Sequence, residues 1–310
     1  MADADVEPKA ESAESVLVDV VVVSYNSRSV LRDAVIRLVD EPQLNVIVVD
    51  NASTDDSLAA VGGLPVEAIA LPRNGGFAHG CNHGWRAGCA PYVLFLNPDA
   101  RIEPAAIRKL IDVLAREDRT GLVAPLIRKE NGSLEFSIRR FPRLISRYAQ
   151  ALFLQRIFPR RKWSDEVVRD PDEYRERTVV EWVSGACLLV RRSLLERVGG
   201  WDERFFLYCE DIDLCKRIQE AGFDVVFEPA ATVVHAGGAS ASRPALLPML
   251  AQSRIRFVQK HGTRATRLLE RLGIGLCALT HVFVAKGGIE TRAGHARSLK
   301  VVAGRAMRHP

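Results

Sequence analysis

Three carboxylates lie close together in the stretch of the chain that best fits a catalytic role. Glu210, Asp211 and Asp213 follow a short apolar run and precede residues with helical spacing at 214–221. Negative side chains in the first turn of a helix are favoured by the helix dipole, so capping explains one or two of them. A carboxylate at the edge of an apolar cleft can also act as a general base towards a substrate hydroxyl. We expect Asp213 to face another side of the helix and to pair with Arg217 at its surface.

Polar side chains also follow three short apolar runs that have the length and composition of buried strands. These polar residues are Ser24, Tyr25 and Asn26 after the first run, Asp50 and Asn51 after the second, and Asn97 and Asp99 after the third. Ligands of open parallel sheets bind at the carboxyl ends of the strands. A single strand-end aspartate is usually a turn former, but Asp50 and Asp99 together, at the rims of neighbouring strands, favour a ligand site.

The loop at 73–80 is rich in glycine and opens a helix that is expected to run through Trp85. Its glycines fit neither a dinucleotide-binding fingerprint nor a P-loop. The loop can still bring the backbone close to a phosphate at the helix start, although a glycine in a connection is usually just a turn. Further along the chain, His235 ends a predicted strand and is either a satisfied core or surface histidine or a metal ligand.

These residues need a sheet to bring them together. Strands are predicted at 18–23, 45–50, 66–71, 91–97 and 121–127. Helices are predicted between them: one at 29–40, one that begins after a capping box of Ser53 and Asp56, one that runs from the glycine loop through residue 85, and one at 104–116. Because strand and helix alternate four times, the first 127 residues are expected to form an open, mainly parallel α/β sheet flanked by helices.

The second half of the chain is less regular. Residues 128–180 are interpreted as an insertion or lid on the sheet, with the basic clusters Arg139-Arg140 and 160–162 on its solvated surface. Further elements are predicted after it, namely a strand at 181–190, short strands at 225–227 and 232–235, and a helix at 244–260.

Length and composition fit one large globular domain or two small ones, because 47% of the 310 residues are apolar. The six cysteines form no C-x-x-C pair and indicate reduced thiols in a cytosolic protein. Residues 1–16 are polar and acidic, which predicts a flexible tail and no signal peptide. From Arg243 onward thirteen Lys and Arg face two acidic residues, a net charge of +11, which leaves 5 − 11 = −6 for the preceding part. A basic tail on an acidic body favours an anionic partner, either a membrane surface or a nucleic acid.

Within that basic tail, residues 268–285 are largely apolar. The uninterrupted part, 272–285, is too short to span a bilayer, which needs about 20 residues. With its basic flanks the segment predicts a helix that lies on the membrane surface. A core helix with a basic face is an equally good interpretation.

Seven short motifs occur in an order that resembles a known enzyme family. They are Val-Val-Ser-Tyr-Asn at 22–26, Val-Val-Asp-Asn-Ala-Ser-Thr-Asp at 48–55, Asn-Gly-Gly-Phe-Ala at 74–78, Leu-Asn-Pro-Asp at 96–99, Ser-Gly-Ala at 184–186, Val-Gly-Gly-Trp-Asp-Glu at 198–203 and Tyr-Cys-Glu-Asp-Ile-Asp-Leu-Cys at 208–215. As a set they resemble the family 2 inverting glycosyltransferases, and most of all the rhamnosyltransferase-like branch of bacterial cell-surface polysaccharide synthesis. The resemblance implies a GT-A fold, a sugar donor linked to dTDP or UDP, and a divalent cation, Mg²⁺ or Mn²⁺.

The resemblance also implies roles for single residues. Asp211, beside Glu210, matches the catalytic base. Asp99 matches the last acid of a D-x-D metal motif, and His235 resembles a later histidine that completes the metal shell. Since Asn97 stands where the first acid of that motif would be, the cation should be held more weakly and partly by the donor pyrophosphate.

Binding roles follow from the same resemblance. The donor is expected to contact the strand ends and the glycine loop, at Ser24, Tyr25, Asn26, Asp50, Asn51, Asn74, Gly76 and Asn97. The acceptor is expected at Trp182, Ser184 and Gly185.

The sequence thus predicts a GT-A glycosyltransferase domain over 17–262, with a nucleotide-sugar-binding half at 17–127, an acceptor and catalytic half at 128–262, and a basic amphipathic extension over 263–310. We expect it to transfer rhamnose or another deoxyhexose to a lipid-linked or polysaccharide acceptor, in the cytoplasm at the inner face of the membrane, with no nucleic acid partner. The alternatives are the same fold with a hexose or N-acetylhexosamine donor, and a non-catalytic nucleotide-sugar-binding protein.

Overall fold

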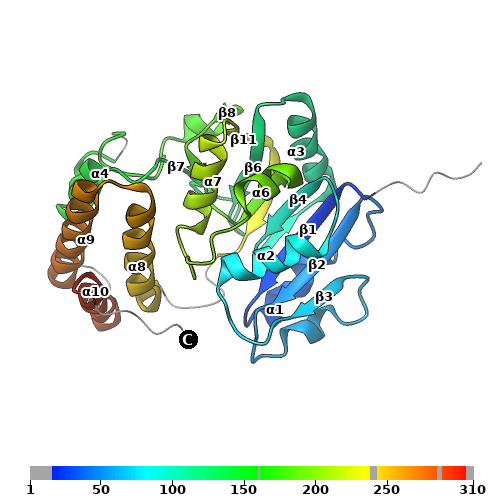
Figure 1. Cartoon of the computed structure of the whole chain (residues 1–310), viewed down its shortest axis with the longest axis horizontal. Coiled ribbons are helices and arrows are strands. Elements are labelled where there is room, and N and C mark those ends of the chain that lie inside the picture. Colours follow the sequence, from blue (N-terminus) through cyan, green and yellow to red (C-terminus); the bar gives the residue numbers. More distant parts are fainter. Residues whose placement is uncertain (1–15, 160, 238–242, 285–287, 305–310) are drawn as a thin grey trace, which may run out of the picture.

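A computed structural model describes residues 16–159, 161–237, 243–284 and 288–304 of the chain (Figure 1). Nearly all of the predicted N-terminal tail lies outside these residues. Within them, nine strands form one mixed, mostly parallel sheet in the order β3-β2-β1-β4-β10-β6-β11-β5, with β8 paired to β11. Helices flank this sheet, so the predicted α/β architecture is confirmed.

The first strands form the parallel part of the sheet. β1 (Val18–Ser24) lies between β2 (Leu44–Asp50) and β4 (Tyr92–Leu96), and β3 (Glu67–Ala70) is the edge strand beyond β2. β1 is buried along its whole length, which explains its run of valines, since both of its faces are covered. The expectation that Asp50 and Asp99 follow neighbouring strands is wrong, because β1 separates β2 from β4.

The first 127 residues do not complete the sheet alone. β10 (Cys187–Arg191) runs antiparallel between β4 and β6 (Thr120–Arg128). β11 (Asp224–His235) pairs parallel to β6, and β5 (Ala100–Ile102) pairs antiparallel to β11. The alternation of strands and helices in the sequence gives no sign of β10 at this place, because β10 comes from much later in the chain.

A separate apolar core lies on each face of the sheet. One core includes α1 (Arg28–Val35) and α3 (Pro104–Arg116). The other includes α2 (Phe77–Ala87), α6 (Arg192–Val198) and α7 (Glu210–Glu220). The helix predicted at 104–116 has these bounds in the structure, whereas the helix predicted at 29–40 already ends at Val35.

The predicted capping box is wrong. The element after β2 is η1 (Ser57–Val61), a 3-10 helix whose N-cap residue Asp56 makes no side-chain cap bond. The Ser53 hydroxyl donates instead to the carboxylate of Asp50 at 2.5 Å. Since this bond orients the acid at the end of β2, Ser53 acts on the strand end and not on the next helix.

The irregular region between β6 and β10 has its own small elements. β7 (Ile138–Arg139) and β9 (Trp182–Val183) form a two-stranded sheet, so the strand predicted at 181–190 is two strands, β9 and β10. The other elements here are α4 (Leu144–Ala151), α5 (Leu154–Ile157), η2 (Pro171–Tyr174) and β8 (Thr178–Val179). The two strands predicted at 225–227 and 232–235 are the single strand β11, whose register shifts between Glu228 and Thr232.

The C-terminal helices pack against this region. α8 (Arg243–His261) contacts α10 (Gly288–Val302), and α9 (Arg264–Val284) packs on α4. Beneath them the Arg147 guanidinium pairs with Glu270 at 2.8 Å and with Glu166 at 3.4 Å, while Arg254 of α8 binds both oxygens of Glu166. Part of the positive charge of the C-terminal region is therefore neutralised inside the protein. No helix in the described part of the chain has the length and apolar character needed to cross a membrane.

Candidate active site

A cavity of about 600 Å³ lies where the carboxyl ends of β1, β2 and β4 meet α7 and α8. It gathers residues that are far apart in the sequence. Twelve of the fifteen predicted site residues line it, namely Tyr25, Asn51, Asn74, Gly76, Asn97, Asp99, Trp182, Ser184, Gly185, Glu210, Asp211 and His235. Both predicted halves of the domain therefore contribute to one site.

Three predicted site residues do not line the cavity. Ser24 is fully buried at the end of β1, and its hydroxyl has no hydrogen-bond partner among the described residues. The Asn26 side-chain oxygen accepts a bond from the Thr54 N–H at 2.8 Å, and Asp50 accepts one from the Ser53 N–H at 2.9 Å. The Asn26 bond connects the end of β1 to the loop after β2, and the Asp50 bond holds that loop in place.

The glycine loop is held by an asparagine. The buried Asn51 side chain donates to the Gly76 carbonyl at 3.0 Å and accepts from the Gly75 N–H at 3.1 Å. Gly76 has φ = 91°, and a Cβ there would lie 2.3 Å from the carbonyl oxygen of Phe206. The same carbonyl accepts from the Phe77 N–H at 2.9 Å. Glycine is required here because the loop touches the segment that leads to the three carboxylates.

His235 connects two carboxylates at the end of β11. Its Nε2 atom lies 3.2 Å from Oδ1 of Asp99, and its Nδ1 atom lies 3.3 Å from Oε2 of Glu135. Burial alone lowers the pKa of His235, but the two acids outweigh it and raise the pKa to about 9. Burial raises the pKa of Asp99, yet the hydrogen bond and charge of His235 hold it below its usual value.

The same cluster is the best fit to the predicted metal site. Among the described residues, no three His, Cys, Asp or Glu side chains are grouped so that they could hold a metal ion. Asp99 and Glu135 lie at opposite nitrogens of the His235 ring, so they cannot share one ion with it. Asp99 offers an oxygen ligand of the kind that Mg²⁺ and Mn²⁺ prefer, and Nε2 of His235 could add a nitrogen ligand only after the ring has lost its proton, so substrate and water would have to supply the rest.

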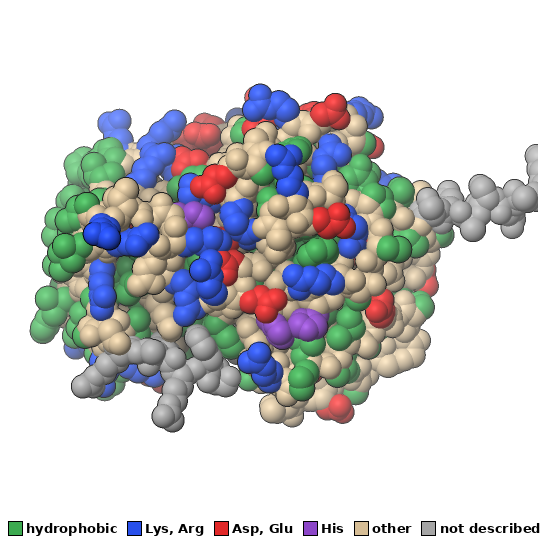
Figure 2. Space-filling view, viewed as in Figure 1, with side chains coloured by type: hydrophobic (Ala, Val, Ile, Leu, Met, Phe, Trp, Pro, Cys, Tyr) green, Lys and Arg blue, Asp and Glu red, His purple; other side chains and the backbone are tan. Residues whose placement is uncertain are grey.

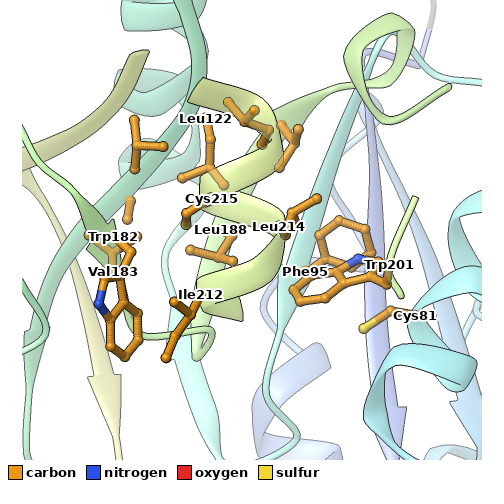
Figure 3. Close-up of a cluster of buried hydrophobic side chains, with 14 of the residues drawn as sticks. Cys81, Phe95, Leu122, Trp182, Val183, Leu188, Trp201, Ile212, Leu214 and Cys215 are labelled. Atoms are coloured by element: carbon orange, nitrogen blue, oxygen red, sulfur yellow. The ribbon is translucent and has the colours of Figure 1, made fainter. Parts of the chain in front are cut away.

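The carboxylates of α7 are reached through a strained turn. Tyr208 and Cys209 both have left-handed backbone conformations, with φ of 70° and 67°. Such conformations are uncommon for residues with side chains and persist where packing fixes them. Figure 3 shows that fixing contact: Ile212, Leu214 and Cys215 of α7 point into the apolar core between Trp182 and Trp201. The turn therefore directs the start of a firmly packed helix at the cavity.

Glu210 and Asp211 begin that helix and differ in their surroundings. Glu210 is buried, and its Oε2 atom has no hydrogen-bond partner among the described residues. Burial and the charge of Asp211 raise the pKa of Glu210 to about 8. The half-buried Asp211 accepts from the Gly185 N–H at 3.2 Å and from the Ile212 N–H at 2.8 Å. Burial also raises the pKa of Asp211, but these bonds and the positive charge of Arg139 oppose the shift.

Asp213 differs from its prediction. It pairs with Arg217 at 2.7 Å, as expected, but its side chain is fully buried and not at the surface. It also lies 2.6 Å from the Lys260 ammonium and 2.7 Å from Nε2 of His261. The contacts with α8 could not be foreseen from the spacing on α7, so Asp213 is a buried structural anion.

Arg139 belongs to the site, so its predicted place on the solvated surface is wrong. Its side chain lines the cavity, and its guanidinium carbon lies 5.7 Å from the centre of the Trp182 ring. The pairing of β7 with β9 brings these two residues together. Since the paired residues are far apart in the chain, no local sequence pattern predicts the contact.

Comparison with known proteins identifies relatives of this chain. The family model "Glycosyl transferase family 2" matches residues 19–199, and "Glycosyl transferase family group 2" matches 145–262. An N-acetylglucosaminyl-diphospho-decaprenol L-rhamnosyltransferase of Mycobacterium tuberculosis is 34% identical over 289 residues, which cover 88% of this chain and 92% of that protein. Rhamnosyltransferase WbbL of Escherichia coli is 32% identical over 168 residues, 52% of this chain and 60% of that one.

Solved structures with the same fold are more distant in sequence. A mannosyltransferase from Pyrobaculum calidifontis, in complex with GDP-Man and Mn²⁺, matches with a TM-score of 0.54 and 17% identity over 95% of this chain and 77% of its own. GalNAc-T7 with UDP, GalNAc and Mn²⁺ matches with a TM-score of 0.60 and 14% identity over 93% and 56%. These likenesses confirm the predicted GT-A fold.

Proposed function

The chain belongs to glycosyltransferase family 2, and from this premise we propose that it transfers rhamnose from a nucleoside diphosphate to a lipid-linked glycan of the cell envelope. The observation that carries the proposal is Asp211, a carboxylate oriented by the Gly185 N–H at the wall of a cavity that Asp99 also lines. A base and a strand-end acid in one cavity suit the transfer of a sugar to a hydroxyl. The rhamnose specificity rests on the two rhamnosyltransferase relatives.

The transfer we propose is a single displacement. Asp211 takes the proton of the acceptor hydroxyl while that oxygen bonds to the anomeric carbon of the sugar. The bond from the anomeric carbon to the donor phosphate oxygen breaks, and the nucleoside diphosphate leaves with the electron pair, so the configuration is inverted. A positioned general base of this kind contributes about 10²–10⁴-fold to the rate. Burial raises the pKa of both Glu210 and Asp211, but Asp211 accepts two backbone N–H bonds that favour its charged form, so we assign the role of the base to Asp211.

We propose that the donor occupies the side of the cavity formed by the strand ends, with dTDP or UDP as its nucleotide. Tyr25, Asn74 and Asn97 line this side. Asp99 and His235 would hold a divalent cation, which stabilises negative charge on a leaving diphosphate when bound. With two protein ligands, the ion would bind most tightly together with the donor. In this arrangement 17–127 bind the nucleotide sugar, and 128–262 carry the base and the acceptor at Trp182, Ser184 and Gly185.

A lipid-linked acceptor requires contact with a membrane, and one end of the molecule is suited to it. Of the fourteen large apolar side chains that are exposed among the described residues, eleven lie at this end. They form an apolar end face that consists of Ile145, Leu152, Ile157, Phe158, Leu268, Leu269, Leu272, Leu279, Phe283, Val284 and Ile289. Figure 2 shows apolar side chains gathered at the end where Figure 1 places α4 and α9, with Lys and Arg beside them.

α9 presents its apolar residues as a helix on a membrane surface would. Leu268, Leu272, Leu279 and Phe283 recur at spacings of four and seven on one side, with exposed fractions of 45–72%. The opposite side, with Ile274 and Ala278, packs inward. We therefore propose that the protein works in the cytoplasm at the inner face of the membrane, with 263–310 and α4 against anionic lipid.

Vesicle co-sedimentation tests this contact. Wild-type protein should sediment with phosphatidylglycerol vesicles, and less so at high salt. The double variant Leu272→Glu, Phe283→Glu should lose at least about tenfold in partitioning, since each buried apolar side chain contributes about 1.5–3 kcal/mol. The matched control is Ile36→Glu, Val179→Glu, which changes exposed apolar residues elsewhere and should sediment like wild type. Equal sedimentation of all three proteins would contradict the proposal.

The function itself is tested by offering a panel of donors, dTDP-rhamnose, UDP-glucose and UDP-N-acetylglucosamine, with a short-chain prenyl diphosphate N-acetylglucosamine as acceptor. We expect transfer from dTDP-rhamnose and inversion at the anomeric carbon by NMR. Transfer from a UDP-hexose or UDP-N-acetylhexosamine alone would favour the same fold with another donor. Donor binding without any transfer would favour a non-catalytic nucleotide-sugar-binding protein.

A further inference from the structure

Arg139 is a cavity-lining cation that forms no direct ion pair with a described residue, although the charges of Asp211 and Glu166 act on it from a distance. Its half-buried side chain makes no hydrogen bond or ion pair with any described residue, and its Nε atom is shielded from solvent without an acceptor. The ring of Trp182 supports the guanidinium from one side at 5.7 Å. A guanidinium carries five N–H donors in a fixed plane, and no described residue accepts a hydrogen bond from those of Arg139.

Two neighbouring arginines show how the protein treats a buried cation that serves stability. Arg254, which also lines the cavity, binds both oxygens of Glu166, and Arg147 pairs with Glu166 and Glu270. These four side chains balance one another. A half-buried cation that forms no direct ion pair is costly to keep, so an anionic ligand that binds beside Arg139 is the best explanation for it.

We propose that Arg139 binds the diphosphate of the lipid-linked acceptor. The inference rests on the proposed function for the identity of the lipid, and it adds a binding site for the acceptor's anionic group. Planar guanidinium groups bind phosphate oxygens in pairs, with strong charge-assisted hydrogen bonds. The diphosphate would thus receive the donors that the protein leaves unused.

The place of Arg139 favours the acceptor over the donor. Arg139 lies on the Trp182 side of the cavity, whereas the strand-end residues proposed for the donor follow β1, β2 and β4. Three apolar residues of α8, Leu246, Met249 and Leu250, also line the cavity. A cavity that combines this guanidinium with apolar side chains suits a phosphorylated lipid.

The experiment uses farnesyl diphosphate as the probe, titrated calorimetrically into the full-length protein already saturated with dTDP. Wild type should bind it. Arg139→Gln should weaken this binding about 10- to 100-fold, the range that corresponds to charge-assisted hydrogen bonds, and Arg139→Lys should lie between the two. The matched control is Arg140→Gln, which removes the next arginine in the chain and should bind like wild type. Affinity for dTDP should be the same in all four proteins.

The outcomes separate the possibilities. Equal farnesyl diphosphate affinity in wild type and Arg139→Gln would overturn the inference, as would wild type that binds no farnesyl diphosphate once dTDP is bound. A loss of dTDP affinity in Arg139→Gln would overturn it too, because the arginine would then serve the donor. Thermal unfolding of each variant shows whether it is folded. Since no rhamnose is transferred in this assay, the result is independent of the donor panel that tests the proposed function.

Discussion

The two sides of α7 carry charged groups in opposite situations. Towards α8, Asp213 is surrounded by Arg217, Lys260 and His261 and is fully buried. Towards the cavity, one Glu210 oxygen has no hydrogen-bond partner among the residues that the structure describes, and Asp211 lies near the charge of Arg139 without a direct bond to it. The first group is matched within the protein and stabilises the fold. The second is left unmatched, which costs stability and makes binding and proton transfer possible.

The largest expected effect is on the cavity side. Asp211→Asn keeps the size of the side chain and removes the proton acceptor, so turnover should fall at least about 100-fold, the low end for a lost general base. Donor affinity should stay near wild type, because no donor contact is assigned to this residue. The free energy of unfolding should change little. Steady-state kinetics, dTDP titration and urea unfolding measure the three quantities, and normal turnover in this variant would remove Asp211 from the mechanism.

On the side of α7 that faces α8, we expect a substitution of Asp213 to lower stability and to leave turnover unchanged. Asp213→Asn removes a fully buried anion from contact with Arg217, Lys260 and the His261 ring, and should lower the free energy of unfolding by about 3–5 kcal/mol. The folded fraction should turn over at a rate close to wild type. Urea unfolding and an assay corrected for folded protein test this expectation. A stable but inactive Asp213→Asn variant would reverse the roles of the two acids.

The strand-end acid should affect donor binding and not the fold. In wild type we expect a chelator to weaken dTDP binding, and in Asp99→Ala the chelator should make no difference, with affinity reduced about tenfold or more for the loss of one charged ligand. Asp118→Ala is the control, since this exposed aspartate lies outside the cavity and should bind the donor like wild type. If neither the chelator nor Asp99→Ala changes the affinity for the donor, the proposal that a cation binds at Asp99 is wrong.

The smallest effect concerns stability against pH. Because the folded pKa of Glu210 is raised to about 8, the unfolded chain loses this proton at lower pH than the folded one. Stability should therefore fall as pH rises from the ordinary glutamate pKa towards 8. Glu210→Gln should lack this part of the loss and exceed wild type at pH 8 by more than about 1 kcal/mol, since each pKa unit corresponds to about 1.4 kcal/mol. Urea unfolding at several pH values, compared between the two proteins, measures it.

Much of the cavity could be predicted because parallel strands present their carboxyl ends at one edge of a sheet. That rule brought Tyr25, Asn51 and Asp99 together from their positions after apolar runs. The start of α7 was visible from the apolar spacing that follows Glu210. In these cases the local pattern of apolar residues is enough to predict where the site residues lie.

The wrong predictions have one cause in common, which is that they depend on contacts between distant parts of the chain. Arg139 reaches the cavity through the pairing of β7 with β9, and Asp213 is buried by α8. β10 enters between β4 and β6 from outside the predicted alternation. A basic pair and an acid in a helical first turn are usually exposed, and only tertiary contacts reveal that these are not.

The central claim is that Asp211 removes the proton in the step that forms the glycosidic bond. Single-turnover transfer, at saturating donor and acceptor, measures that step for Asp211→Asn and Asp213→Asn side by side. We predict that Asp211→Asn binds both substrates and forms product at least about 100-fold more slowly than wild type, while folded Asp213→Asn forms it at the wild-type rate. A wild-type rate in Asp211→Asn, or the slow step in Asp213→Asn instead, would contradict the claim.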